Sequence, residues 1–236
     1  MSPILFPEDI KAIVRGDHGD PFAVLGPHQV GVGTGTAVAV RVFLPGVRQA
    51  SVVPVDLPDD GEPMELLHTD GFFETVFLGR RHLFAYRLRV VDGQGQTLEV
   101  EDPYRFPPAL SEYDLYLMGE GTHLRNYEKL GAHAMKLEGV AGVNFSVWAP
   151  NAKRVSVVGD FNHWDGRCHP MRNHPGNGIW EIFIPGLREG ALYKFEVKAR
   201  SGEEIALKAD PYACAFESAP RTASIVCDIN TYRWGD

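Results

Sequence analysis

An internal repeat constrains the fold of this 236-residue chain more than any other feature of its sequence. The segment VAVRVFLPGVRQASVV (38–53) aligns with VNFSVWAPNAKRVSVV (143–158) at an offset of 105 residues. The two segments share Val, Val and Pro and the terminal Ser-Val-Val. LGPH at 25–28 and LGAH at 130–133 keep the same offset. A repeat of this length predicts two copies of one domain fold.

The offset grows slowly along the chain. GFFETVFLG (71–79) aligns with GIWEIFIPG (178–186) at an offset of 107, and Asp102-Pro103-Tyr104 aligns with Asp210-Pro211-Tyr212 at 108. Small loop insertions explain a drift of this size, so each copy is expected to span about 100 residues.

Both copies carry the pattern of antiparallel β-strands. Short runs that alternate, or are rich in β-branched and aromatic residues, are separated by Gly, Pro and Asp turns. In the first copy these runs are AVAVRVFLP, QASVVPV, FFETVFL, FAYRLRVV and TLEVE. In the second they are VNFSVWAP, RVSVVGDF, IWEIFIPG, LYKFEVKA and EIALKAD. The spacing is Ig-like, so we expect an all-β chain of two tandem antiparallel β-sandwiches.

Two segments lie outside the strand pattern. Pro7 opens a short helical pattern that Gly16 ends. The segment SEYDLYLMGEGTHLRNYEKLGAH is too apolar for a free linker, so a packed connector is expected. The expected domains are a first sandwich (1–110), the connector (111–134), a second sandwich (135–228) and the start of a further linker (229–236).

The charge and cysteine content exclude several classes of protein. Lys and Arg total 23 against 31 Asp and Glu, a formal net charge of −8, and the basic residues are scattered. This argues against nucleic acid or an acidic membrane as a partner. Apolar runs are shorter than the roughly 18 residues of a membrane helix. Cys168, Cys214 and Cys227 form an odd set without a close pair, and the N-terminus lacks the pattern of a signal peptide. We therefore expect a cytoplasmic protein.

No pattern in the sequence predicts an active site. There is no G-x-S-x-G elbow and no Cys-His arrangement beyond the adjacent Cys168 and His169. His163, Asp165, Cys168, His169 and His174 crowd into twelve residues, but their spacing matches no usual zinc arrangement. We expect no catalytic residue, no metal and no cofactor in this chain.

The two copies differ most after the shared Ser-Val-Val. The second copy continues with GDFNHW where the first has PVDLPD, so the shared fold does not require Trp164. An aromatic ring at a turn beside Asn162 suits a sugar, because sugar C–H faces pack on rings and sugar hydroxyls need polar partners. The alternative is that Phe161 and Trp164 plug one end of the sandwich. Trp148 and Trp180 lie in alternating runs and are predicted to be core residues.

Four stretches of the chain carry a family resemblance: HGDPFAVLGPH (18–28), DLYLMGEGTHLRNYEKLGAH (114–133), FSVWAPNAKRVSVVGDFNHWDG (145–166) and KADPYACAFESAPRTAS (208–224). Together they resemble the N-terminal part of bacterial 1,4-α-glucan branching enzymes, members of the α-amylase superfamily. The third stretch is similar to a carbohydrate-binding module of family 48, found also in isoamylases, trehalose-forming hydrolases and glycogen-sensing kinase subunits. The first two are more specific to branching enzymes with a duplicated N-terminus.

The resemblance implies a parent enzyme of glycogen biosynthesis that cuts an α-1,4 chain and transfers it to a 6-hydroxyl. In that family a (β/α)8 barrel after these modules carries an Asp nucleophile and a Glu acid/base. This chain stops at TYRWGD, near where the barrel would begin, and holds none of the catalytic motifs. We therefore expect inactive N-terminal modules that position glucan and support the missing barrel. The alternatives are a stand-alone glucan-binding or regulatory protein, and the N-terminus of an isoamylase or trehalohydrolase.

The resemblance to the glycogen-sensing modules also implies sugar contacts. They carry over to Trp164 of FNHW and Lys194 of YKF, with Asn162 as a further candidate. The expected ligand is an α-1,4-glucan such as glycogen or a maltooligosaccharide. A second tryptophan, expected shortly after YKF, is missing from VKARSGEEIALKAD.

Overall fold

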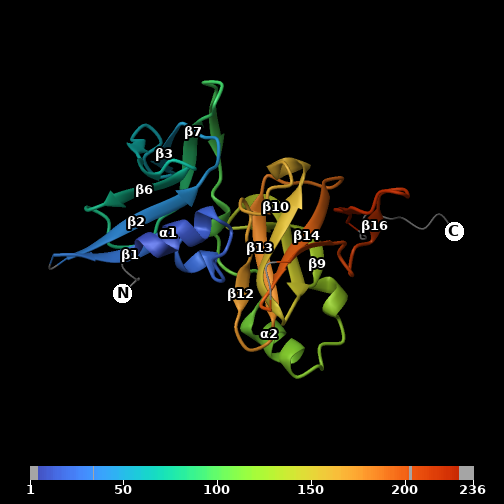
Figure 1. Ribbon diagram of the computed structural model, residues 1–236. Helices are drawn as coiled ribbons and strands as arrows, with labels where there is room; N and C mark the ends of the chain where they lie inside the picture. The colour runs from blue at the N-terminus through green and yellow to red at the C-terminus, as the bar shows by residue number, and fades with distance from the viewer. Residues whose placement is uncertain (1–4, 34, 202–203, 229–236) are drawn as a thin grey trace. The chain divides into compact units, whose positions relative to one another are not determined.

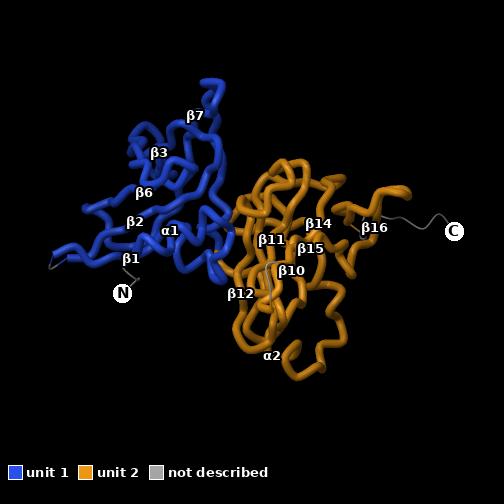
Figure 2. Tube along the Cα trace, viewed as in Figure 1, with its two compact units in different colours: residues 1–106 blue, residues 107–236 orange. Residues whose placement is uncertain are grey.

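The computed structural model describes residues 5–33, 35–201 and 204–228, and the expected linker at 229–236 lies outside these ranges. Within them the chain forms four antiparallel sheets and two short α-helices (Figure 1). The prediction of an all-β fold is therefore confirmed. The chain divides into two compact units, residues 1–106 and residues 107–236 (Figure 2).

The helices are short and lie outside the sheets. They are α1 (Pro7–Val14), α2 (Glu112–Gly119) and the 3-10 turns η1 (Pro21–Ala23), η2 (Pro103–Arg105), η3 (Asn126–Glu128) and η4 (Asp160–Asn162). The predicted N-terminal helix is α1. Pro7 occupies its first position, where a missing N–H costs nothing, and Gly16 just beyond its end has a φ of +64°. No helix of the described residues is long and apolar enough to cross a membrane.

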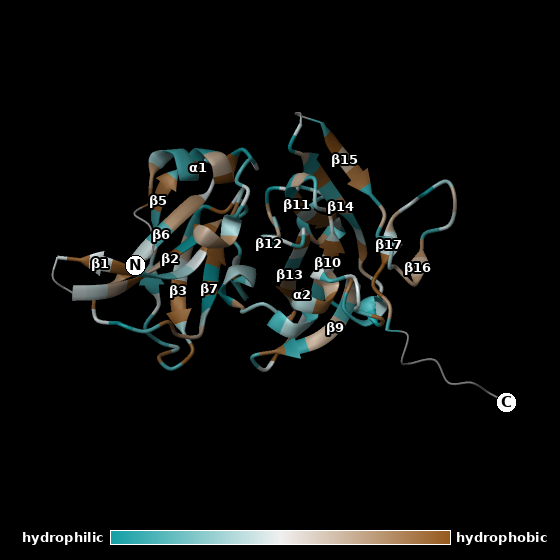
Figure 3. Cartoon of the chain, turned by 90° about the horizontal axis from the view of Figure 1, so that it is seen from below, coloured by the Kyte–Doolittle hydropathy of each residue, from teal (hydrophilic) through white to brown (hydrophobic). Residues whose placement is uncertain are grey.

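The first unit packs two four-stranded sheets, with strand orders β1-β2-β6-β5 and β4-β3-β7-β8. The strands are β1 (Gly26–Val32), β2 (Gly35–Phe43), β3 (Gln49–Pro54), β4 (Glu62–Pro63), β5 (Glu65–His68), β6 (Phe72–Phe77), β7 (Tyr86–Val91) and β8 (Thr97–Val100). Its core includes alternate residues of β2, Val38, Val40 and Val42, packed near Val52 and Leu88 of the facing sheet. Figure 3 shows apolar residues, in brown, along strands such as β3 and β7.

The second unit repeats this plan. One sheet has the order β12-β13-β10-β9, and the other has the order β11-β14-β17-β16, with β15 on β14. The strands are β9 (Gly131–Leu137), β10 (Val140–Trp148), β11 (Ala152–Gly159), β12 (Arg172–His174), β13 (Ile179–Pro185), β14 (Leu192–Ala199), β15 (Ile205–Lys208), β16 (Ala215–Phe216) and β17 (Ser224–Ile225).

The strand registers show that the two units are copies of one fold. Gly26 pairs with Arg41 between β1 and β2, and Gly131 pairs with Ser146 between β9 and β10. Each residue of the second pair therefore stands 105 positions after its counterpart in the first pair, which is the offset of the sequence repeat. In the facing sheets, Val52 pairs with Leu88, and Val157 pairs with Phe195, at offsets of 105 and 107. The tandem duplication read from the sequence is confirmed at the level of individual pairs.

The repeated Asp-Pro-Tyr motif anchors a buried tyrosine in each unit. Tyr86 Oη donates to Asp102 Oδ2 at 2.5 Å, and Tyr193 Oη donates to Asp210 Oδ2 at 2.6 Å. The backbone N–H two residues after each aspartate donates to its other oxygen, at 3.0 Å and 2.8 Å. Burial raises the pKa of Asp102 to about 6 and also raises the pKa of Asp210.

The two strand tryptophans have different environments. Trp180 is 1% exposed, as predicted. The prediction that Trp148 belongs to the core is wrong, because its side chain is 61% exposed. Trp148 is the last residue of β10, and its register partner Ile179 shares its side of the sheet, whereas Val147 and Trp180 face the opposite side. Its indole Nε1 donates to Asn177 O at 3.1 Å.

The connector between the strands of the two copies is packed at its inner side. Leu115 and Met118 of α2 lie against a buried cluster of Leu110, Leu130 and Ile179. Ser111 caps the helix. The carboxylate of Asp114, three residues further on, accepts a hydrogen bond from Ser111 and forms ion pairs with His123 and Lys129. These charge-assisted contacts hold the pKa of Asp114 well below its usual range although burial opposes the shift. Three aromatic residues of the same segment are exposed, namely Tyr113, Tyr116 and Tyr127.

Candidate functional site

The turn that follows β11 holds Trp164 in an unusual backbone conformation. Gly159 ends the strand, η4 follows, and His163 and Trp164 then have φ values of +54° and +60°. Two successive non-glycine residues in the left-handed region each cost about 1 kcal/mol, so the surrounding contacts must hold them. The Trp164 N–H donates to Gly159 O at 2.9 Å and thereby closes the turn.

Asn162 supplies most of these supporting contacts. Its Oδ1 accepts from Gly159 N at 2.9 Å, and its Nδ2 donates to Val157 O and to His169 Nδ1, both at 2.8 Å. Burial lowers the pKa of His169 to about 4, so the ring is neutral at pH 7 and can accept this bond. Asn162 is only 5% exposed. Both amide donors of Asn162 bind protein atoms, so the side chain shapes the turn, and the expected glucan contact of Asn162 stays a prediction.

The loop beyond the turn is fixed to the sheet. Its residues His169 to Met171 run beside β11, with Val157 N donating to His169 O at 3.1 Å and Met171 N to Val155 O at 2.8 Å. Arg154 on β11 donates to Gly166 O and to the carboxylate of Glu196, each at 2.5 Å. The turn that carries Trp164 is thus held at both ends.

Trp164 itself is half-buried. Its indole Nε1 donates to Asp160 Oδ1 at 2.8 Å, which fixes the ring while part of it stays accessible to solvent. Phe161, the other aromatic residue of the turn, packs against His169 with ring centroids 5.7 Å apart. Phe161 and Trp164 are both half-buried, and Phe161 is the one whose ring packs on His169.

Lys194 lies at the same end of the same strand pair. It is on β14 opposite Val158, one residue before the glycine at which β11 ends. Its Nζ donates to Thr222 Oγ1 at 2.7 Å and leaves donor capacity for another partner. The structure thus brings Trp164 and Lys194 to one end of the β11–β14 pair, and it places Asn162 beneath that surface.

The polar cluster considered for zinc has other partners. Asp165 binds Arg167, which lowers the pKa of the carboxyl group. Burial raises the pKa of Cys168 to about 12, so its thiol stays protonated. Among the described residues, no group of three or more His, Cys, Asp and Glu is arranged to hold a metal ion.

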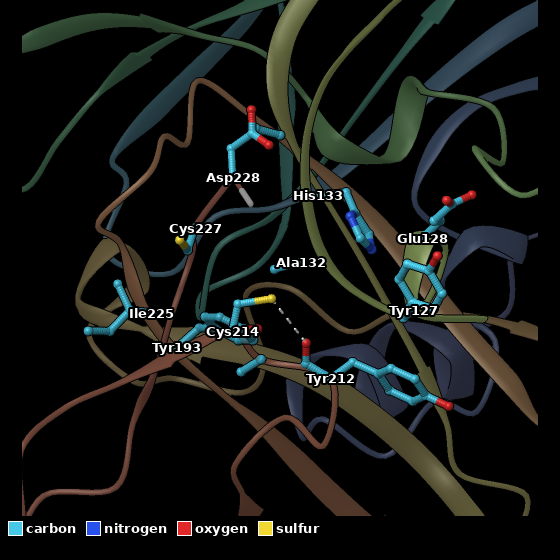
Figure 4. A pocket seen from close by; sticks show the side chains of 12 residues that line it. Tyr127, Glu128, Ala132, His133, Tyr193, Tyr212, Cys214, Ile225, Cys227 and Asp228 are labelled. Atoms are coloured by element: carbon cyan, nitrogen blue, oxygen red, sulfur yellow. Dashed lines mark hydrogen bonds between the residues drawn. The ribbon is translucent and has the colours of Figure 1, made fainter. Parts of the chain in front are cut away.

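A pocket of about 550 Å³ lies elsewhere in the second unit, and the sequence interpretation did not identify it. Its lining comes from η3, β9, β14 and the segment around β16 and β17 (Figure 4). The side chains that reach it include Tyr127, Glu128, His133, Tyr212, Cys214 and Cys227. The signal that could have revealed it is the repeat, because Tyr127 stands 105 residues after Phe22.

The fold defines a duplicated, all-β sandwich protein. A family model described as "Carbohydrate-binding module 48 (Isoamylase N-terminal domain)" matches residues 129–213. A second model, described as "alpha-1,4-glucan branching enzyme GlgB, N-terminal domain", matches residues 6–104. The chain is therefore similar to the N-terminal region of GlgB branching enzymes, which the two models match in its two successive parts. The resemblance read from four sequence stretches is confirmed.

The relatives are considerably longer than this chain. The 1,4-alpha-glucan branching enzyme GlgB of Rubrobacter xylanophilus is 54% identical over 97% of this chain and 30% of its own length. That of Paramagnetospirillum magneticum is 53% identical over the same shares. The chain thus spans about 30% of the curated relatives that it matches. Among solved structures, a pullulanase complexed with maltotetraose from Anoxybacillus sp. LM18-11 is 15% identical over 81% of this chain and 25% of that one, with a TM-score of 0.37.

Proposed function

We propose that this chain forms the non-catalytic N-terminal modules of a 1,4-α-glucan branching enzyme and that its second unit binds α-1,4-glucan through Trp164 and Lys194. The whole enzyme would cut an α-1,4 chain and join it to a 6-hydroxyl. These modules would hold the glucan and support a catalytic barrel. None of the three cysteines forms a disulfide, which supports a cytoplasmic location.

The observation that carries the proposal is the fixed, accessible ring of Trp164 at the strand end that also carries Lys194. A glucose ring offers C–H faces for an indole and hydroxyls for an ammonium group, so both chemical requirements meet at one end of the sheet. The strained turn adds support, because backbone strain at successive residues persists where a site requires a fixed side chain.

Trp164→Ala should weaken maltoheptaose binding by about tenfold, since a stacking surface and its orientation are both lost. Alanine keeps a Cβ at the left-handed position, so the backbone preference changes little. Isothermal titration calorimetry measures the Kd, and circular dichroism confirms the fold. Trp148→Ala is the matched control, because Trp148 is an exposed tryptophan of the same unit that lies outside this turn. Equal affinity of the Trp164 variant and the unmodified chain would make the ring a structural one.

The purified chain should produce no α-1,6 branches from amylose. Retaining glycosyl transfer needs a nucleophilic and an acidic carboxyl group placed about 5 Å apart on either side of the scissile bond. The motifs that would supply them are missing from this sequence. Debranching of the product followed by chain-length analysis measures the linkages, and a complete GlgB enzyme serves as the positive control. Any rise in α-1,6 linkages above background contradicts the prediction.

A further inference from the structure

The pocket in the second unit is built on a scaffold that the first unit shares. In each unit a histidine after the Leu-Gly pair binds a backbone carbonyl, with His28 Nε2 3.0 Å from Leu25 O and His133 Nε2 2.9 Å from Leu130 O. Each unit also has the buried Tyr–Asp pair beneath the tyrosine of its Asp-Pro-Tyr motif. The histidine contact and the Tyr–Asp pair therefore belong to the shared fold, because both units have them.

The first unit fills the corresponding space with an aromatic ring. Phe22 in η1 packs on Tyr104 with ring centroids 4.9 Å apart, and Tyr104 is 7% exposed. The result is a closed, apolar contact.

The second unit leaves this space open. The counterparts of the two rings are Tyr127 in η3 and Tyr212, which are 52% and 37% exposed. Within the described residues these two tyrosines form no ring pair. The cavity of about 550 Å³ lies where the first unit has its ring contact. Figure 4 shows Tyr127, Glu128 and His133 grouped along one side, with Tyr212 below them and Cys214 and Cys227 across from them.

The chemistry of the lining selects a neutral, hydroxyl-rich ligand. Two accessible phenol rings offer flat surfaces for sugar C–H groups. His133 donates through Nε2 to Leu130, which leaves Nδ1 as an acceptor, and Glu128 adds a carboxylate. Among the residues that the structure describes, no lysine or arginine lines the pocket, so an anionic ligand would find no counter-charge from these side chains. A volume in the range of small-ligand sites fits an oligosaccharide end.

We propose that this pocket is a second α-glucan subsite, separate from the Trp164 turn, in which Tyr127 and Tyr212 contact the sugar rings. The choice of ligand rests on the proposed function. The location does not, because it follows from the difference between the two copies.

The two cysteines of the pocket provide a local readout. Cys214 and Cys227 are exposed in the described chain, and both line the cavity. A bound oligosaccharide should shield them from iodoacetamide. At a maltoheptaose concentration of twice the Kd, site occupancy should slow their alkylation by roughly threefold. Mass spectrometry of the full 236-residue chain measures each cysteine separately, and an equal concentration of sorbitol is the control for viscosity and osmotic effects.

Variants separate this subsite from the turn. Tyr127→Ala and Tyr212→Ala should each abolish the protection of both cysteines, whereas Trp164→Ala and the control Tyr113→Ala should retain it. Protection that persists in both pocket variants, or alkylation rates that maltoheptaose does not change in the unmodified chain, overturns the inference. If maltoheptaose still binds and Trp164→Ala weakens it, the proposed function stands without the second subsite. If protection survives and the Trp164 variant binds normally, the pocket stands and the Trp164 site fails.

Discussion

The buried carboxyl groups of the Asp-Pro-Tyr motifs show how one residue couples this fold to pH. Asp102 is 2% exposed, and burial raises its pKa from 3.8 to about 6 although Tyr86 and a backbone N–H donate to it. The folded state therefore holds this proton more tightly than the unfolded state does. The stability that the protonated group contributes is complete below pH 4 and is lost as the pH rises through about 6.

Asp102→Asn should flatten the fall in stability between pH 4.5 and 7. A shift of about two pKa units corresponds to roughly 3 kcal/mol, and the neutral amide has no proton to lose. Urea denaturation across this range measures the difference. Asp56→Asn is the control, because Asp56 is an exposed partner of Arg80 with a pKa below its ordinary value, which places its titration outside the range. Identical pH slopes for the Asp102 variant and the unmodified chain would refute the assignment.

At the same scale, the site residues selected from the sequence stay a prediction, and the structure gives their positions. Sequence reasoning selected Trp164 and Lys194, which the structure brings to one strand end. It also selected Asn162, whose amide is consumed by the turn. Residue type and spacing predict that a turn carries a polar side chain, but the direction of the side chain depends on η4 and on two left-handed residues, which no local pattern in GDFNHW reveals.

Within the elements, alternation predicted the strands well and the position of their ends poorly. Trp148 and Trp180 both lie in alternating runs, yet only Trp180 is enclosed. A period of two assigns a side chain to one side of a sheet. Its burial then depends on which other residues cover that side at its position along the strand. The capping box of α2, Ser111 with Asp114, was recognisable as S-x-x-D before an apolar run, so that helix could have been predicted.

Trp180→Ala should therefore destabilise the second unit by about 3–5 kcal/mol, as expected for a large ring removed from a core. Trp148→Ala should cost less than about 1.5 kcal/mol, since it loses one net hydrogen bond and little buried surface. Urea denaturation followed by circular dichroism measures both free energies of unfolding. Comparable losses in the two variants would mean that Trp148 is covered in solution.

Over the whole molecule, the duplication was the most predictable property. Two copies with the same strand register repeat the same spacing of apolar residues in the sequence. The sequence does not predict in the same way that corresponding aromatic rings are packed in one copy and exposed in the other. Phe22 and Tyr127 differ by one hydroxyl group, and nothing in their own segments states that one ring is packed and the other exposed. That outcome depends on whether the ring packs on its distant counterpart, Tyr104 or Tyr212, which lies more than 80 residues further along the chain.

Paired substitutions in the two copies test this divergence. Phe22→Ala should destabilise the first unit by about 2 kcal/mol, because a half-buried ring loses its contact with Tyr104. Tyr127→Ala should change the stability of the second unit by less than about 1 kcal/mol, since its ring lies at an open pocket. Leu25→Ala and Leu130→Ala are the matched controls, being counterparts that are both buried, and each should cost about 2–5 kcal/mol. Amide hydrogen exchange in β1 and β9 reports each unit separately. If Tyr127→Ala costs as much as Phe22→Ala, the two copies use this ring alike, and the second copy has no space to offer a ligand.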